Sequence, residues 1–187
     1  MTIDDAVAAL GRGEIIGLPT DTLYGLAVDP FREEAVEAMY DLKGRKNKKP
    51  LALLVADIEQ AMRVAELTDR ALELADRHWP GGLTMVLNRL SSVPDWVGDT
   101  RARTVGVRCP NHEAALQLLR RTGPLAVTSA NLSGRHSAVD HTEAREQFGD
   151  TVGYYVEGTA PGGQASTVLD LTLPSPLILR AGPVKGA

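Results

Sequence analysis

Glu14-Ile-Ile-Gly-Leu-Pro-Thr-Asp-Thr-Leu-Tyr-Gly25 is an apolar run that ends abruptly in a polar loop. Residues 14–19 are typical of a short buried strand, and residues 20–25 of a loop or turn. Three hydroxyl or carboxyl side chains directly after such a strand bring hydrogen-bonding groups to the edge of a sheet, where function tends to lie. The same residues are also typical of a turn with Asx-type capping, so this segment alone leaves both interpretations open.

Outside this segment, apolar runs and helical periodicities alternate along the chain. Helices are predicted at residues 3–12, 33–43, 57–66, 68–78 (capped by Thr68 or Asp69), 112–121 and 141–148. Further strands are predicted at residues 51–55, 83–87, 104–108, 125–127, 153–157, 166–171 and 177–180. This alternation, without repeats or a linker, predicts a single α/β domain over residues 1–187, built on a largely buried mixed sheet.

The composition narrows the class of protein. With 187 residues, 43% hydrophobic and 24% charged, the chain is typical of a soluble globular protein rather than a disordered one. A net charge of -4 excludes a uniformly basic nucleic-acid coat but allows a local basic patch. The lone cysteine, Cys109, excludes an intrachain disulfide and is most easily interpreted as a small buried hydrophobe.

The chain shows no segment directed at a membrane. Its longest continuous apolar run, Leu51–Ala56, is far shorter than the ~20 residues that span a bilayer. The acidic N-terminus lacks the basic and apolar regions of a secretory signal. We therefore expect a cytoplasmic protein.

Several common catalytic and cofactor motifs are missing. The sequence contains no P-loop, no dinucleotide fingerprint, no H-E-x-x-H and no G-x-S-x-G. Its four histidines show no zinc-ligand spacing with cysteine, so we interpret them as surface or capping residues. Cys109 has no recognisable base partner and is not predicted to be a nucleophile.

Two segments have unusual polar composition. Lys43-Gly-Arg-Lys-Asn-Lys-Lys49 places five cations in seven residues, which suits phosphate or nucleic acid, although most charge runs are simply solvated loops. Thr128-Ser-Ala-Asn-Leu-Ser-Gly134 follows a strand and gathers small hydroxyl and amide groups. It could contact a base, ribose or phosphate, or form a helix cap and turn.

Two arginines end apolar strands, Arg108 in TVGVR and Arg180 in LILR. A guanidinium at the end of a buried run needs an anionic partner. That partner is either an internal carboxylate or a ligand.

Taken in order, seven motifs resemble one family: P-T-D-T-x-Y-G-L, K-G-R-x-x-x-K-P-L, W-P-G-x-L-T, V-x-V-R-x-P, S-A-N-x-S-G, S-T-V-x-D and L-R-x-G. The chain resembles the YrdC/Sua5 family, the threonylcarbamoyl-AMP synthases, from about Gly13 to Gly182. Because the chain ends just past L-R-x-G, we expect the short single-domain form.

The resemblance implies both a fold and a reaction. The fold is a twisted, mostly parallel mixed sheet flanked by helices, with a wide concave site. The reaction joins ATP, L-threonine and bicarbonate (or CO2) into L-threonylcarbamoyladenylate and pyrophosphate, with Mg2+ accompanying ATP. The product serves the N6-threonylcarbamoyladenosine modification of tRNA, which partner proteins complete. The threonine amine takes up CO2 as a carbamate, and a carbamate oxygen then attacks the α-phosphorus of ATP. Neither of these two steps needs a protein nucleophile. Positioning and charge neutralisation are therefore the expected contributions of the protein, and no catalytic side chain is assigned.

The resemblance also implies roles for individual residues. The threonine-site residues are Thr22, Arg108, Ser166 and the hydroxyl of Thr128 or Ser129. The residues expected to hold the ATP phosphates are Lys43, Arg45 and Lys49. The residues expected to line the nucleotide are Thr104, Ala130, Asn131, Ser137 and Arg180. Asp21 is interpreted as a residue that orients its loop, and no metal ligand is assigned.

The sequence departs from the family pattern at four positions. Leu54 stands where the family often has a histidine beside threonine, which removes one polar contact and bears on amino-acid selectivity. Thr128, Ala165 and Ala181 replace a common proline, glutamate and proline. None of these positions carries one of the central cations.

Two alternatives remain open. The first is a binding module for tRNA or double-stranded RNA that uses the basic segment 43–49. The second is a paralogue of the same fold with another carbamoyl chemistry, as in the hydrogenase-maturation carbamoyltransferases.

Overall fold

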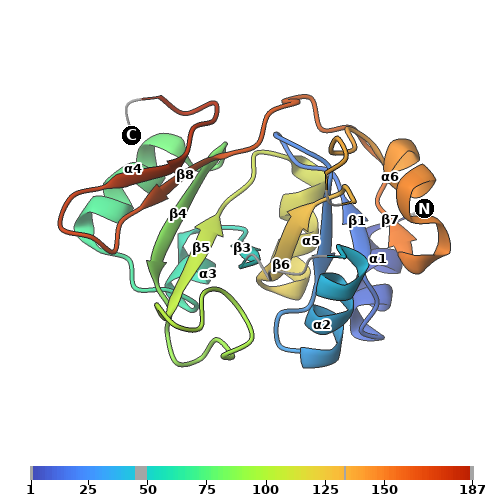
Figure 1. Cartoon of the computed structure of the whole chain (residues 1–187), viewed down its shortest axis with the longest axis horizontal. Helices are drawn as coiled ribbons and strands as arrows, with labels where there is room; N and C mark the ends of the chain where they lie inside the picture. Colours follow the sequence, from blue (N-terminus) through green and yellow to red (C-terminus); the bar gives the residue numbers. More distant parts are fainter. Residues whose placement is uncertain (1, 45–49, 133, 186–187) are drawn as a thin grey trace.

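The computed structural model describes residues 2–44, 50–132 and 134–185. Within these ranges the strands of a nine-stranded sheet follow one another along the long axis of the molecule (Figure 1). The helices are α1 (Ile3–Gly11), α2 (Glu33–Leu42), α3 (Ile58–Met62), α4 (Asp69–His78), α5 (Glu113–Thr122) and α6 (His141–Phe148), with a 3-10 turn at Gly149–Thr151. The strands are β1 (Ile16–Leu18), β2 (Gly25–Val28), β3 (Ala52–Leu54), β4 (Leu83–Asn88), β5 (Thr104–Arg108), β6 (Leu125–Ser129), β7 (Tyr154–Tyr155), β8 (Thr167–Asp170) and β9 (Leu177–Arg180).

The strand order is β7-β1-β2-β6-β3-β5-β4-β8-β9. Among the described residues, β1–β7, β3–β5 and β4–β8 pair in parallel, and the other five pairs are antiparallel. The expected mixed sheet is confirmed, but antiparallel pairs outnumber parallel ones, contrary to the expected predominance of parallel pairing. The short β1–β2 and β8–β9 connections contribute to this difference, because parallel neighbours need a long crossover whereas a short turn joins antiparallel strands.

The first face of the sheet is apolar across most of its strands. Leu26, Leu53, Met85, Val107 and Leu169, from five different strands, are completely buried in one cluster. Helices α2, α3, α4 and α6 contribute apolar residues to the same cluster. This face therefore forms the main core.

The second face is covered over only part of its width. Ile16, Leu18, Leu54 and Leu125 pack there with residues of α1 and α5, which also contact each other. This second cluster contains no residue of β4, β5 or β8. The sheet thus has two covered faces at β1, β2 and β6, and a face not covered by these helices at β5, β4 and β8.

Gly17, in β1, lies between two buried tyrosines. A Cβ atom on Gly17 would come within 2.8 Å of the rings of both Tyr24 and Tyr155. The Tyr24 hydroxyl donates to the Val156 carbonyl at 2.7 Å, and the Tyr155 hydroxyl donates to the Gly149 carbonyl at 2.8 Å. Because both rings are fixed by these bonds, there is no space for a side chain at position 17.

Most predicted elements are present with shifted ends, and one strand was missed. Residues 20–25 were predicted to form a loop or turn, and no strand was predicted at β2. This strand has only four residues and follows a polar loop, so it shows no strand periodicity, although it pairs both with the neighbouring β1 and with the distant β6. Helix α3 is shorter than the predicted 57–66, and β7 is shorter than the predicted 153–157. The Thr68 hydroxyl caps α4 as predicted and accepts from the Ala71 N–H.

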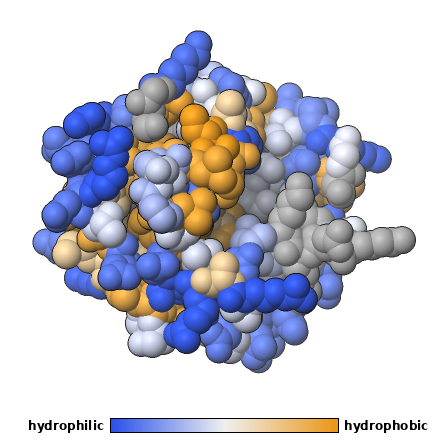
Figure 2. Space-filling model, turned by 60° about the vertical axis from the view of Figure 1, so that its left-hand side comes forward, coloured by the Kyte–Doolittle hydropathy of each residue, from blue (hydrophilic) through white to orange (hydrophobic). Residues whose placement is uncertain are grey.

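Strand β9 forms one edge of the sheet and exposes apolar side chains. Leu177, Ile178 and Leu179 are 49%, 51% and 54% exposed. Successive strand residues point to opposite faces, so both faces of β9 are open. The side of the molecule that carries β9 comes forward in Figure 2, where apolar surface lies beside charged surface. Within the described ranges no helix is both long and apolar enough to span a bilayer.

We expect Gly17→Ala to lower the free energy of unfolding by about 1–3 kcal/mol, because a methyl group at this position overpacks the tyrosine pair. Gly11→Ala is the matched control: nothing lies within 4 Å of its added Cβ, and alanine is the better helix former. Urea unfolding followed by circular dichroism measures both variants. An unchanged midpoint for Gly17→Ala would contradict the packing described here.

We expect the Cys109 thiol to react slowly with iodoacetamide in the native protein at pH 8. Cys109 is 3% exposed, and burial raises the pKa of its thiol to about 11, so little thiolate forms at that pH. The labelling rate should rise about tenfold per pH unit towards pH 11 while the protein stays folded. Labelling in guanidinium chloride is the control, and equal rates in the native and denatured protein would contradict the prediction.

Candidate active site

The uncovered part of the second sheet face is lined by small and polar side chains. The strand register places Thr84, Val86, Gly106 and Ala52 together on this face. An added Cβ on Gly106 would lie 3.2 Å from Thr84 Cγ2 and 3.6 Å from Ala52 Cβ. Ala52, Val86 and Gly106 are only half-buried, whereas the strand residues that alternate with them belong to the main core. This surface forms the floor of the candidate site.

Arg108, the last residue of β5, joins three segments at the edge of this floor. Its Nε donates to the Gly81 carbonyl at 2.9 Å, and its Nη1 donates to the Thr22 hydroxyl at 2.6 Å. Its Nη2 donates to Asp21 Oδ1 at 2.6 Å. The same Asp21 oxygen accepts from the Asn111 N–H at 2.9 Å, so Asp21 orients both its own loop and the guanidinium. Of the two kinds of anionic partner expected for Arg108, an internal carboxylate or a ligand, the structure shows the first, Asp21.

The surroundings of Arg108 are suited to a further anion. The Arg108 side chain is 7% exposed and that of Asp21 is 18% exposed. Burial lowers the pKa of the Arg108 guanidinium, Asp21 opposes this effect, and the nearby positive charge of Arg180 lowers the pKa further. A guanidinium stays protonated in proteins, so two cations share this region. Three of the five N–H groups of Arg108 donate in the bonds above, and an incoming anion could accept from the rest.

Ser166, immediately before β8, carries a second set of polar contacts. Arg180 donates from Nε to the Ser166 carbonyl and from Nη2 to the Ser166 hydroxyl, both at 2.9 Å. The Ser166 hydroxyl also lies 2.8 Å from the Thr84 hydroxyl. Thr84 and Ser166 are each 5% exposed. Both predicted residues, Ser166 and Arg180, thus lie in one hydrogen-bonded group on β4, β8 and β9.

The Gly81–Gly82 turn brings the two groups together. An added Cβ on Gly82 would lie 3.6 Å from Thr22 Cγ2, and the Thr167 N–H donates to the Gly82 carbonyl at 2.9 Å. The loop that carries Thr22 and the start of β8 therefore meet at Gly82. Three of the predicted threonine-site residues, Thr22, Arg108 and Ser166, lie around this turn.

The fourth predicted threonine contact was left open between Thr128 and Ser129. The pairings Arg108↔Leu54, Leu54↔Leu125 and Gly25↔Ser129 place Ser129 on the same sheet face as Arg108. Thr128 alternates with Ser129 and lies on the other face. The Ser129 hydroxyl donates to Asn131 Oδ1 at 2.6 Å. Register therefore favours Ser129 over Thr128 as the hydroxyl on the site face.

Lys43, predicted to hold ATP phosphates, has different surroundings here. The side chain follows α2, is 1% exposed, and donates to the Ser129 carbonyl at 2.6 Å and to Asn131 Oδ1 at 3.0 Å. It also donates to the Asn131 carbonyl. These acceptors belong to the last residue of β6 and to the segment that follows it. In this structure Lys43 orients the segment, and its contact with phosphate stays a prediction.

The remaining nucleotide-site predictions are placed as follows. Thr104 pairs with Asn88 at one end of the site face. Ala130 is completely buried, so it can offer only backbone groups, and its N–H donates to the Tyr24 carbonyl. Ser137 is half-buried in the loop before α6. Their contact with a nucleotide stays a prediction.

The predicted phosphate residues Arg45 and Lys49 lie outside the described residues. Over the ranges that the structure describes, no group of three or more histidine, cysteine, aspartate or glutamate residues is arranged to hold a metal ion.

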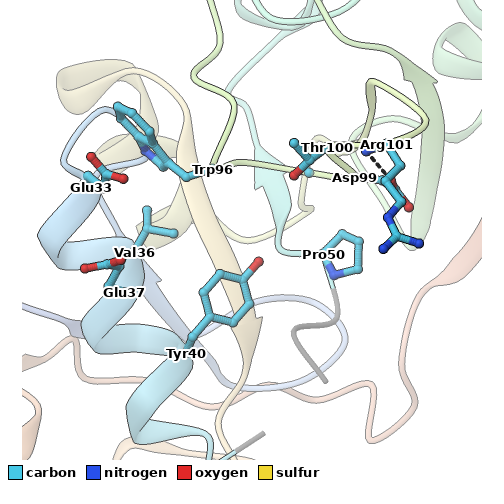
Figure 3. A pocket seen from close by; sticks show the side chains of 10 residues that line it. Glu33, Val36, Glu37, Tyr40, Pro50, Trp96, Asp99, Thr100 and Arg101 are labelled. Carbon is cyan, nitrogen blue, oxygen red and sulfur yellow. Dashed lines mark hydrogen bonds between the residues drawn. The ribbon is translucent and has the colours of Figure 1, made fainter. Parts of the chain in front are cut away.

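A cavity of about 470 Å³ lies between α2 and the loop that joins β4 to β5, and it contains none of the predicted site residues (Figure 3). Side chains from α2 face those of the loop across it, and the Arg101 N–H donates to Asp99 Oδ1 at 2.9 Å. Its charged and aromatic lining residues are Glu33, Glu37, Tyr40, Trp96, Asp99 and Arg101. Among the described lining residues, three carboxylates stand against one guanidinium, so these residues alone do not attract a polyphosphate.

Sequence reasoning missed two features of the site. Thr84 was quoted within W-P-G-x-L-T but received no role, because a threonine in a strand is usually a packing residue. Gly81, in the same motif, also received no role, whereas its carbonyl is an acceptor for Arg108. The sequence carried a signal for both residues, because W-P-G-x-L-T places Gly81 shortly before an apolar strand and Thr84 inside it.

Comparison with known proteins adds the evolutionary context. A relative from Mycobacterium leprae is 43% identical over 189 residues, which cover 99% of this chain and 84% of the relative. A protein from Pseudoalteromonas translucida named threonylcarbamoyl-AMP synthase is 34% identical, over 90% of this chain and 92% of its own length. The crystal structure of Pyrococcus abyssi Sua5 complexed with L-threonine matches with a TM-score of 0.90 and 36% identity. The match covers 96% of this chain and 54% of the archaeal chain, so this chain spans about half the length of that protein.

The family model for Sua5, YciO and YrdC, which carries the description "Telomere recombination", matches residues 8–182. This range contains all seven motifs and every residue of the candidate site. The resemblance noted in the sequence is thereby confirmed, and the chain belongs to the Sua5/YciO/YrdC family.

Proposed function

We propose that this protein is an L-threonylcarbamoyladenylate synthase. The amine of L-threonine takes up CO2, supplied by bicarbonate, to give a carbamate and a proton. A carbamate oxygen then attacks the α-phosphorus of ATP, the bond to the β-phosphate oxygen breaks, and pyrophosphate leaves. The products are threonylcarbamoyl-AMP and pyrophosphate.

The observation that carries this proposal is the pair of arginines at the edge of the open sheet face. Arg108 presents a fork that fits a carboxylate, and Arg180 adds positive charge beside the Ser166 hydroxyl. Thr22 lies between the Arg108 fork and the Gly82 turn: its hydroxyl accepts from Arg108, and its methyl group is on the side of Gly82. Together these groups suit an amino acid bound by its carboxylate. The relatives named threonylcarbamoyl-AMP synthase support threonine as that amino acid.

The chemistry needs positioning rather than a protein nucleophile, because the carbamate itself attacks phosphorus. Cys109, the one thiol of the chain, suits this reading: its pKa is raised to about 11 by burial, and it is therefore a poor nucleophile at neutral pH. The cations of the site stabilise the negative charge that develops as pyrophosphate departs. Arg180 is the described candidate for this role, and Arg45 and Lys49 are the predicted ones.

Mg2+ is proposed to enter with ATP. It usually keeps several waters and binds through substrate phosphates rather than a dedicated protein cage. When bound, it neutralises phosphate charge and so favours loss of pyrophosphate. We further propose that partner proteins transfer the threonylcarbamoyl group to tRNA, and that direct contact of this chain with RNA is weak.

We expect pyrophosphate release from ATP, Mg2+ and bicarbonate to depend on L-threonine. Serine lacks the methyl group and serves as the comparison amino acid, which should act less efficiently. The measurement is a coupled pyrophosphate assay with and without each amino acid. Pyrophosphate release without any amino acid requirement would contradict the synthase and favour another carbamoyl chemistry, whereas RNA binding without release would favour the RNA-binding alternative.

We expect Arg108→Lys to raise the KM for threonine at least tenfold, because an ammonium cannot replace the bidentate fork. The KM for ATP should change much less. Arg77→Lys is the matched control, since Arg77 lies exposed on α4 and only pairs with Glu73. Thermal unfolding verifies that both variants are folded. A folded Arg108→Lys protein with an unchanged KM for threonine would show that Arg108 does not bind the amino acid.

A further inference from the structure

We propose that Thr84 is a positioning residue for the amino-acid substrate. Its hydroxyl donates to Ser166, and this bond leaves the Ser166 proton directed at the carboxylate of the bound amino acid. The inference rests on the proposed function and adds a residue to which no role has been assigned.

The geometry places Thr84 behind Ser166. Thr84 is the second residue of β4, and β4 pairs with β8 so that Leu83 lies opposite Thr167. Ser166 comes directly before Thr167, and the two hydroxyl oxygens are 2.8 Å apart. The Ser166 oxygen is thus held from one side by Thr84 and from another by Arg180 Nη2.

Counting protons limits how the pair can be arranged. A hydroxyl group has one proton and two acceptor positions, and a guanidinium only donates. Arg180 therefore fills one acceptor position of Ser166. Two hydroxyl protons remain for one Thr84–Ser166 bond, so one proton is left over. The described contacts give that proton no further acceptor: Thr84 bonds only Ser166, and the Ser166 hydroxyl bonds only Thr84 and Arg180.

The proposed function decides which oxygen carries the left-over proton. Thr84 and Ser166 are each 5% exposed, so burial does not distinguish them. A hydroxyl binds a carboxylate by donating its proton. When Ser166 contacts the carboxylate of the amino acid, its proton is used there, and Thr84 is then the donor in the Thr84–Ser166 bond. In this arrangement every group is satisfied.

Packing alone does not require a hydroxyl at this position. The neighbours of Thr84 on the site face include Val86 and the backbone of Gly106, and valine has the same shape as threonine. A valine here would keep the strand and its contacts, because β-branched apolar residues suit strands. The hydroxyl is therefore the part of Thr84 that the site uses.

The test compares Thr84→Val with Thr84→Ser. We expect Thr84→Val to raise the KM for threonine about tenfold with a smaller change in kcat and an unchanged KM for ATP. Thr84→Ser restores the hydroxyl and should return the KM for threonine to within about threefold of the unmodified protein. Thr142→Val, on the exposed surface of α6, is the control for loss of a threonine hydroxyl. Thermal unfolding shows whether each variant is folded.

A double-variant experiment separates positioning from a direct contact. If Thr84 acts through Ser166, Thr84→Val should have no further effect on the KM for threonine in a Ser166→Ala background. Independent, multiplying effects would overturn the proposal. So would an unchanged KM in folded Thr84→Val, or a failure of Thr84→Ser to restore it. If the unmodified protein shows no threonine-dependent pyrophosphate release, the proposed function itself fails, and this inference fails with it.

Discussion

A buried guanidinium cannot stay without partners, and this requirement organises the site. Arg108 ends a core strand, so its charge is held inside the protein unless other segments come to it. The loop after β1 supplies Asp21 and Thr22, and the turn before β4 supplies the Gly81 carbonyl. These segments are distant in the sequence but are fixed by one side chain. The site is therefore prepared before any substrate enters.

The second determinant is the unequal coverage of the sheet. Helices α1 and α5 cover the second face at β1, β2 and β6. Where these helices no longer cover the sheet, its surface is lined by small residues. Because Gly106 has no side chain and Ala52 only a methyl group, they leave space above this part of the sheet, and Thr84 adds a hydroxyl to the surface. Because the other face carries the main core, the open face can bear polar groups without weakening the fold. The arrangement separates the part of the sheet that stabilises the protein from the part that meets substrate.

Sequence patterns predicted what is local and missed what is long-range. Arg108 and Arg180 stood out because a cation at the end of an apolar strand is rare, and the structure gives both of them polar partners in the site region. Strand β2 was missed because it has only four residues and follows a polar loop, and its pairing with the distant β6 leaves no mark in the local sequence. Lys43 stood out by charge, but charge alone could not show that its side chain is buried against the end of β6 and the residue Asn131. The phosphate contacts of Arg45 and Lys49 stay predictions.

The strand order also sets the order in which the sheet can be completed. Strand β6 lies between β2 and β3, although it is made after both of them and after β4 and β5. As the chain leaves the ribosome, the β1–β2 ribbon and the β3–β5–β4 sheet each present an open edge until residues 125–129 emerge and join them. From the completion of β5 until β6 emerges, both of these edges are open, and the nascent chain is exposed to wrong strand pairing.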